Sequence, residues 1–343
     1  MAIKEVRILL VGLGTVNIGL LKILGQRRNE VEKLYNLTFR IVGVADSSGV
    51  ALNTNGFNYE DLITLKTKKG HASGLQGFIE KAKTENISEL VHADLLIESS
   101  PGNLKTGQPG LETVRRSLTH SCSVVLANKA PLVFAFDELH ELAKNHGSRL
   151  AFSATVCGGL PVVNVLKRDL KLATLKSLRG ILNATTNFIL HYMGKGGSMT
   201  GAIREAQRLG AAEADPTHDV HGHDAANKLF IIMKSFTDFS GSVADIEVHG
   251  IQDITLEKIQ MAKDQGNKIK LLATARPTNT GWSLSVSPVE IPASSFLGTC
   301  DGWEMGLEVE TDLYEAIAMK NFEADPVGTS AAVLRDMIEL SAQ

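Results

Sequence analysis

The sequence predicts an α/β fold in which a doubly wound parallel sheet is joined to a second, α+β domain. The first observation is a continuous apolar run at 6–11, which ends in Gly-Leu-Gly and is followed by helical periodicity. The second is that short apolar runs return at 39–45, 95–98 and 123–127 with helical segments between them. Such runs are typical of a parallel sheet that is buried on both faces. The third is a change near residue 150, after which strands of mixed patterning accompany several helices.

The order of the elements predicts that the first domain is discontinuous. Helices are expected at 107–120 and 135–146, and a loop with one short helix at 49–77. In the second half we expect strands at 175–182 and 282–291 and helices at 161–170, 186–194, 199–209, 222–240 and 255–264. The closing DPVGTSAAVLRDMIEL is an amphipathic helix that needs an apolar surface, which the first domain offers. We therefore assign 1–135 with 312–343 to the first domain and 136–311 to the second.

Composition excludes several classes of protein. The net charge is -3 over 343 residues and no basic stripe occurs, so a nucleic-acid partner is not expected. No apolar run reaches membrane-spanning length, and the start of the chain has no signal-peptide layout. The three cysteines are widely spaced and are typical of a reducing, cytoplasmic setting. We expect Cys122 and Cys157 to be buried and Cys300, in a glycine-rich loop, to be more exposed.

A glycine turn at the end of the first strand predicts a dinucleotide site of the Rossmann type. A helix that begins there can hold a pyrophosphate with its unpaired N–H groups. Asn17 stands where the fingerprint has a third glycine, and the next glycine is Gly19. Asp46 ends the second strand and favours NAD, although Ser47, Ser48 and nearby basic residues leave NADP open. The candidate cofactor residues are Gly12, Leu13, Gly14, Thr15, Val16 and Asp46, with Ser99 and Ser100 at the end of the third strand.

A lysine follows the fourth predicted strand directly. Lys129 lies in Ala-Asn-Lys-Ala-Pro-Leu, and this places it at the carboxyl edge of the sheet, where open α/β sheets bind ligands. The plainer interpretation is a surface lysine in a turn before Pro131.

The segment from Gly180 to Lys228 contains a second group of chemically active side chains. Asp224 and Lys228 are four residues apart in a helical pattern and therefore project from one face. Glu213 and Asp219 come in the loop before that helix. One ammonium among several carboxylates can hold a small zwitterion and can transfer a proton. The alternative is a solvated acidic loop with an ordinary surface ion pair.

The motifs taken together resemble the homoserine dehydrogenase family. GLGTV, ANKAPL, ATVCGGLPV, RGILNATTNFIL, AAEADPTHDVHGHDAANKL and GTSAAVLRDMI occur in the family's order over essentially the whole chain. The resemblance implies NAD(P)-linked interconversion of L-homoserine and L-aspartate 4-semialdehyde, in the biosynthesis of threonine, methionine and isoleucine. It implies a dinucleotide-binding first domain and a substrate-binding second domain whose sheet forms a homodimer. The chain is similar to short family members without a C-terminal regulatory domain.

The resemblance also implies roles for single residues. Lys228 matches the family's proton-donating lysine, and Lys129 the lysine between cofactor and substrate. Substrate contacts match Glu213, Asp219, Asp224, Asn183, Ala184 and Thr185, and a cofactor contact matches Gly328. Backbone carbonyls of a sodium loop match Val156, Gly158 and Leu160.

Three positions depart from the family pattern. Ala184 replaces a glycine, Ser153 replaces a glutamate in the sodium loop, and the C-terminal glycine turn is reduced to Asp325-Pro-Val-Gly328. The departures at Asn17, Ala184 and Ser153 leave room for a catalytically silent dinucleotide-binding regulator. Within the same class of enzyme, the alternative is a related amino-acid or semialdehyde dehydrogenase.

A further alternative is a catalytic zinc site in the histidine-rich loop. Its candidate ligands are His218, His221, His223, Asp219 and Asp224. The spacing differs from that of a helical zinc motif, since Gly222 interrupts regular presentation.

Overall fold

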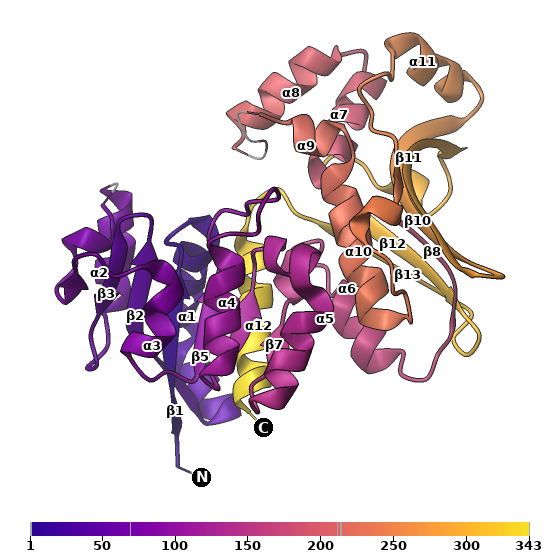
Figure 1. Cartoon of the computed structure of the whole chain (residues 1–343). Helices are drawn as coiled ribbons and strands as arrows, with labels where there is room; N and C mark the ends of the chain where they lie inside the picture. Colours follow the sequence, from indigo (N-terminus) through magenta and orange to yellow (C-terminus); the bar gives the residue numbers. More distant parts are fainter. Residues whose placement is uncertain (1, 69, 211, 213–214, 343) are drawn as a thin grey trace. The chain divides into compact units, whose positions relative to one another are not determined.

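A computed structural model describes residues 2–68, 70–210, 212 and 215–342. The chain forms two compact units, Met1–Gly159 with Pro326–Gln343 and Leu160–Asp325. The first unit is therefore built from two separate segments, one from each end of the chain. Figure 1 shows both units, coloured along the sequence.

The units divide the chain later than the sequence analysis placed the boundaries, which were after 135 and before 312. The segment from 136 to 159 stays with the first unit because it supplies most of α5 and the edge strand β7, which pairs with β6. The segment from 312 to 325 stays with the second unit because β13 pairs antiparallel with β12 along seven residue pairs.

The sheet of the first unit has the strand order β4-β3-β2-β1-β5-β6-β7. Its strands are β1 (Lys4–Val11), β2 (Leu37–Asp46), β3 (Gly49–Leu52), β4 (Phe78–Ile79), β5 (Leu95–Glu98), β6 (Ser123–Leu126) and β7 (Leu150–Ala151). The neighbours β2, β1, β5, β6 and β7 run parallel to one another, whereas β3 pairs antiparallel with both β2 and β4. The strand order reverses direction at β1 and β5, and open α/β sheets bind ligands at the carboxyl ends beside such a switch point.

Helices cover this sheet, with α4 and α5 in front of the strands in Figure 1. The connections β1–α1–β2 and β5–α4–β6 run to opposite sides of β1, so right-handed crossovers place α1 and α4 on opposite faces. The C-terminal helix α12 packs beside α1, and its Val333 and Met337 are fully buried in the same core as Leu20 and Leu24. The sequence prediction that this helix packs on the first domain is confirmed. The helical elements are α1 (Thr15–Tyr35), α2 (Tyr59–Thr67), η1 (Ala72–Gly74), η2 (Thr84–Asn86), α3 (Ile87–Leu90), α4 (Gly110–Thr119), α5 (Ala130–Asn145), η3 (Ser153–Thr155) and α12 (Val327–Ser341).

The second unit contains a six-stranded sheet in the order β13-β12-β8-β10-β11-β9. Its strands are β8 (Leu175–Ile181), β9 (Glu247–Val248), β10 (Asn267–Thr278), β11 (Gly281–Pro292), β12 (Glu304–Thr311) and β13 (Ala316–Phe322). All pairs are antiparallel except β11 with β9. Helices α7 and α10 pack against the sheet, and α8, α9 and α11 lie around them.

The helical elements of this unit are α6 (Val162–Asn164), the π-helical turn η4 (Val165–Asp169), α7 (Ala184–Gly194), α8 (Met199–Arg208), α9 (Thr217–Val220), α10 (His223–Phe236), η5 (Val243–Asp245), α11 (Leu256–Asp264) and η6 (Leu297–Thr299). Five predicted helices of this unit are present, at 162–169, 184–194, 199–208, 223–236 and 256–264, whereas the short elements α9, η5 and η6 were not predicted. Among the described residues, no helix is long and apolar enough to cross a membrane.

The cysteines correct one expectation. Cys122 and Cys157 are buried as predicted, but Cys300 is also fully buried. Its loop turns inward because Cys300 packs in an apolar cluster with Leu297 and Ile181.

Candidate active site

The turn between β1 and α1 is shaped for close approach of a ligand. Gly12 has φ +84°, and a Cβ there would lie 2.7 Å from the carbonyl oxygen of Ser99. Gly14 is the N-cap of α1 and is exposed, and a Cβ there would meet no atom within 4 Å. Leu13 between them is buried and anchors the turn, whereas Thr15 is exposed and Val16 half-buried. The first N–H groups of a helix have no partner within the helix. The turn is therefore open where a pyrophosphate would lie.

Asn17 explains how the turn manages without the third glycine of the fingerprint. Its side chain is fully buried, and Nδ2 donates to the carbonyl oxygens of Gly12 (2.7 Å) and Val11 (3.3 Å). The amide therefore ties the helix to the turn. Gly19 supplies the close packing instead, because a Cβ there would lie 2.3 Å from Oγ of Ser330 on α12.

Asp46 lies at the carboxyl end of β2 and is held by its own loop. Its Oδ1 accepts hydrogen bonds from N (2.8 Å) and Oγ (2.7 Å) of Ser48, and its Oδ2 accepts from N of Ala72 (2.9 Å). His71 Nδ1 lies 3.5 Å from Oδ2. Burial alone would raise the pKa of this carboxyl, but the hydrogen bonds outweigh it and hold the pKa below its usual range. Asp46 is therefore negatively charged at neutral pH.

The ends of β5 and β6 form the opposite rim of the switch point. Ser99 Oγ donates towards the carbonyl oxygens of Val11 (3.3 Å) and Gly12 (3.4 Å), so this rim is tied to the glycine turn. Ser100 follows it, and both serines are half-buried. Lys129 is half-buried at the start of α5, as its position after β6 predicted.

In the second unit the predicted polar residues come together as one cluster. Lys228 Nζ lies 2.7 Å from Oδ2 of Asp224, one turn earlier on α10, and donates to the carbonyl oxygen of Leu182 (2.8 Å). Asn183 Nδ2 donates to Oδ1 of Asp219 and to Oδ2 of Asp224, at 2.8 Å each. The side chain of Lys228 is 15% exposed and that of Asp224 6%, so this is not an ordinary surface ion pair.

The segment ILNATTNFIL folds so that Asn183 both starts α7 and faces this cluster. Asn183 is the N-cap, and its Oδ1 accepts from N of Thr186 (2.8 Å) while its Nδ2 holds the two aspartates. Ala184 is half-buried and Thr185 buried in the first turn that follows. The cap thereby fixes the amide that orients both carboxylates.

A buried lysine that the sequence analysis missed anchors the same helix. Asn187 Nδ2 donates to the carbonyl oxygens of Gly302 (3.1 Å) and Glu304 (2.9 Å), and its Oδ1 accepts from Nζ of Lys270 (2.9 Å). Lys270 is 2% exposed, and burial lowers the pKa of its ammonium while Asp301 opposes that change. The available signal was Lys270 directly before the apolar residues Leu271, Leu272 and Ala273 of β10.

Other predicted residues are placed less decisively. Glu213 lies outside the described residues. Gly328 is the second residue of α12 and packs against Gly159, because a Cβ built on Gly159 would lie 3.1 Å from Cα of Gly328. Val156 and Gly158 belong to the first unit and Leu160 begins the second. Within the described ranges, no group of three His, Cys, Asp or Glu side chains is arranged to hold a metal ion, which disfavours the zinc alternative.

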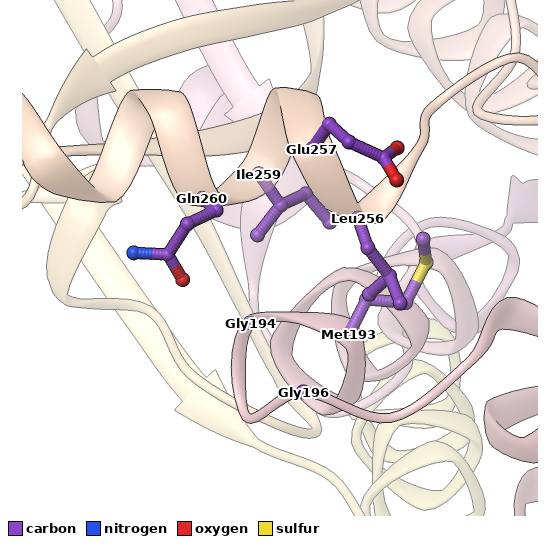
Figure 2. A pocket seen from close by; sticks show the side chains of 7 residues that line it. All are labelled: Met193, Gly194, Gly196, Leu256, Glu257, Ile259 and Gln260. Atoms are coloured by element: carbon purple, nitrogen blue, oxygen red, sulfur yellow. The ribbon is translucent and has the colours of Figure 1, made fainter.

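A separate hollow of about 260 Å³ lies between the end of α7 and α11 (Figure 2). Met193, Leu256 and Ile259 give it an apolar lining, and Glu257 and Gln260 add polar groups. None of the predicted site residues lines it, so it does not belong to the cluster around Lys228.

Comparison with known proteins agrees with this geometry. The homoserine dehydrogenase family model matches residues 161–338, and the model of the homoserine dehydrogenase NAD-binding domain matches 12–153. A homoserine dehydrogenase of Methanocaldococcus jannaschii is 34% identical over 97% of this chain and 98% of its own length. An NAD(+)-dependent homoserine dehydrogenase of Pseudomonas canavaninivorans is 30% identical over 98% of this chain and 96% of its own.

A solved structure shows the same fold. The crystal structure of a putative homoserine dehydrogenase from Archaeoglobus fulgidus has a TM-score of 0.88 and 34% identity, and the match covers 98% of this chain and 100% of that one. The chain therefore belongs to the homoserine dehydrogenase family, whose members are NAD(P)-dependent oxidoreductases.

Proposed function

We propose that this protein interconverts L-homoserine and L-aspartate 4-semialdehyde with a nicotinamide cofactor, in the synthesis of threonine, methionine and isoleucine. The cluster of Asn183, Asp219, Asp224 and Lys228 carries the proposal, because it places one ammonium beside two carboxylates in a largely buried setting. The substrate has the complementary groups, an α-ammonium for the carboxylates and an oxygen at C4 for the lysine. Glu213, by its place in the motif, is proposed to join the carboxylates.

Lys228 is proposed as the group that moves the proton. A bound nicotinamide supplies or accepts the hydride at C4 of the substrate. Negative charge then develops on the C4 oxygen, and an ammonium aimed at that oxygen stabilises the charge and donates the proton. Asp224 orients Lys228 from one turn away, and Asn183 keeps Asp224 in place. Lys129 is proposed to act on the same oxygen from the cofactor side, while Ala184 and Thr185 border the substrate.

For the cofactor we propose a preference for NAD. The open turn at Gly12 and Gly14 fits the pyrophosphate, and Leu13, Thr15, Val16, Ser99, Ser100 and Gly328 are proposed to complete its site. The ionised Asp46 can accept hydrogen bonds from both hydroxyls of a ribose, and it would repel the 2′-phosphate of NADP. His71 close to Asp46 weakens that repulsion only when it is protonated.

The assembly is proposed to be a homodimer formed through the sheet of the second unit. Glu308, Arg179, Thr274 and Ser285 are paired across four strands and are half-buried, whereas their neighbours along the strands are buried. This polar row lies opposite the apolar row that the helices cover, and it offers donors and acceptors for a second copy. Light scattering after size exclusion tests this proposal, since a monomer at micromolar concentration contradicts it.

A sodium ion on the carbonyls of Val156, Gly158 and Leu160 stays a prediction.

The decisive assay follows the absorbance of reduced nicotinamide while L-homoserine is offered with NAD and, separately, with NADP. We expect turnover of L-homoserine with either cofactor, and faster turnover with NAD than with NADP. Lys228→Ala should bind cofactor normally and lose about 10²–10⁴ of kcat, the usual contribution of a positioned proton donor. Lys234→Ala on the same helix is the matched control and should keep its activity.

Two outcomes would redirect the assignment. Cofactor binding without turnover of homoserine indicates the silent regulator, and turnover of another amino alcohol indicates a related dehydrogenase. Near-normal turnover of Lys228→Ala removes the proposed role of the lysine.

A further inference from the structure

Glu98 is a buried carboxyl that the proposed reaction does not use. It is the last residue of β5 and is 0% exposed, and it lies one residue before the serines on the rim of the switch point. Leu95, Leu96 and Ile97 before it are apolar and buried. A carboxyl in such a place is costly to bury unless it is hydrogen-bonded or neutral, so its presence requires a reason.

The side chain of Glu98 joins two loops through a single oxygen. Its Oε1 accepts from N of Ser100 (3.0 Å) and lies in very short contact with Oγ of the same serine. The same Oε1 accepts from Nδ2 of Asn128 (3.3 Å), which precedes Lys129. The loop after β5 and the loop after β6 are therefore held to the same atom.

The main chain and the next hydrogen bond extend the link to α5. The carbonyl oxygen of Glu98 accepts from N of Ala127 (2.9 Å) and N of Asn128 (3.2 Å). Asn128 is 6% exposed, and its Oδ1 accepts from N of Ala130 (3.0 Å) in the first turn of α5. Lys129 therefore lies between two residues that this network fixes.

The space around the link is closed by two glycines. A Cβ on Gly110, at the start of α4, would lie 2.8 Å from Nδ2 of Asn128 and 3.2 Å from Oε1 of Glu98. A Cβ on Gly102 would lie 3.0 Å from Oδ1 of Asn128. The backbone at Gly102 and Gly110 thus packs directly on the two polar side chains and leaves no room for a larger group beside them.

We propose that Glu98 is a positioning residue of the cofactor site, which holds the Ser99–Ser100 turn and the Asn128–Lys129 loop at a fixed separation. The inference rests on the proposed function, because the two loops border the nicotinamide cofactor only in that function. Glu98 touches neither cofactor nor substrate, and it acts through Ser100, Asn128 and Lys129.

The protonation state agrees with a positioning role. Burial raises the pKa of the Glu98 carboxyl, against the hydrogen bonds from Ser100 and Asn128 that lower it. Its Oε2 is buried and has no hydrogen-bond partner within the described part of the chain, whereas Oε1 accepts from its neighbours. Burial therefore favours the neutral acid, in which Oε1 can still accept the hydrogen bonds from Ser100 and Asn128.

The test compares Glu98→Ala and Glu98→Gln in the full-length protein. Glu98→Ala leaves the donors of Ser100 and Asn128 without an acceptor, and we expect the Kd for NAD, measured by NADH fluorescence competition, to rise about tenfold or more. The kcat should fall as well, because Lys129 loses its fixed position. The KM for homoserine should change less than the Kd for NAD, since Asn183, Asp219 and Asp224, which are proposed to bind the substrate, belong to the second unit. Glu98→Gln keeps the neutral shape and one acceptor oxygen, so it should recover most of the lost affinity.

Two controls separate positioning from plain loss of stability. Leu37→Ala makes a cavity at the amino end of β2 in the same unit, and it should lower the Tm without changing the Kd for NAD. If Glu98→Ala does not fold, Asn128→Ala removes the link from the other side and should raise the Kd in the same way.

The possible results are distinct. Wild-type affinity in a folded Glu98→Ala or Asn128→Ala variant overturns the positioning role, and so does a Glu98→Gln variant as weak as Glu98→Ala. An inactive wild-type protein that binds no NAD instead overturns the proposed function itself.

Discussion

Replacing Asp336 by asparagine should stabilise this protein at neutral pH. Asp336 lies on α12 and is 1% exposed. Its carboxyl accepts hydrogen bonds from N (2.8 Å) and Oγ (2.5 Å) of Ser153, where α12 meets the loop after β7. Burial raises the pKa of Asp336 to about 6, in spite of these hydrogen bonds and of the nearby Arg335, which lower it. The ionised form is therefore disfavoured in the folded protein.

The magnitude follows from the two pKa values. The ordinary value is 3.8 and the folded value is about 6, and a shift of about 2 pH units corresponds to about 3 kcal/mol. The folded state binds more protons than the unfolded chain between these values, so stability falls as the pH rises from about 4 to about 6 and then levels. Above that window the protein carries the whole cost of the buried charge.

Asp336→Asn removes the charge, and its one amide oxygen can take the place of Oδ2 as the acceptor for N of Ser153. The amide forms weaker hydrogen bonds than the carboxylate, so we expect a net gain of about 1–2 kcal/mol above pH 7. Near pH 4, where the wild-type group is protonated in the folded state and about half protonated in the unfolded chain, most of the gain should disappear.

Urea unfolding from about pH 4 to about pH 8, in parallel for wild type and variant, measures this difference. Asp137→Asn changes an exposed carboxyl on α5 of the same unit and serves as the matched control for the loss of one negative charge. A variant that is less stable than wild type at pH 8, or a difference that does not vary with pH, would refute the reasoning.

Two further predictions concern the nucleotide site. Gly12→Ala should lower both the Tm and the affinity for NAD, because φ is +84° and the methyl group would lie 2.7 Å from the carbonyl oxygen of Ser99. Gly14→Ala should lower the affinity for NAD alone, because its methyl group would meet no protein atom within 4 Å. Thermal melting with NAD titration checks the pair, and equal Tm losses would contradict it. Asp46→Asn should move the ratio of kcat/KM for NADP over NAD about tenfold towards NADP, since the charge that repels a 2′-phosphate is removed. An unchanged ratio would show that Asp46 does not read the ribose.

The strands at the centre of the first sheet could be predicted because short apolar runs such as 95–98 are typical of parallel strands that are buried on both faces. β3 could not, since it has four residues and pairs antiparallel with β2 in a stretch rich in turn formers. β10 was missed because Lys268 and Lys270 interrupt its apolar pattern, and only the tertiary contact with Asn187 shows that Lys270 belongs inside. Pairing partners far apart in sequence decide such elements, and local propensity does not contain them.

The site shows the same division. The contact of Asp224 with Lys228 follows from helical spacing, and it is confirmed. That Asn183 holds Asp219 and Asp224 joins residues more than 35 positions apart, which no spacing rule provides. Glu98 was read only as the end of a strand, although a single acid after three apolar residues was a usable signal. Asn17 was judged a departure from the fingerprint, whereas its side-chain amide ties α1 to the glycine turn by a hydrogen bond to the carbonyl oxygen of Gly12.

The placement of α12 has a consequence for how the chain acquires its structure during synthesis. Leu160–Asp325 is continuous and can form as soon as it leaves the ribosome, but Met1–Gly159 must wait for Pro326–Gln343 before Val333 and Met337 can fill its core. Until then the apolar side of α1 is open to water or to a chaperone. The core of the first unit is therefore completed only after Leu160–Asp325 has been translated.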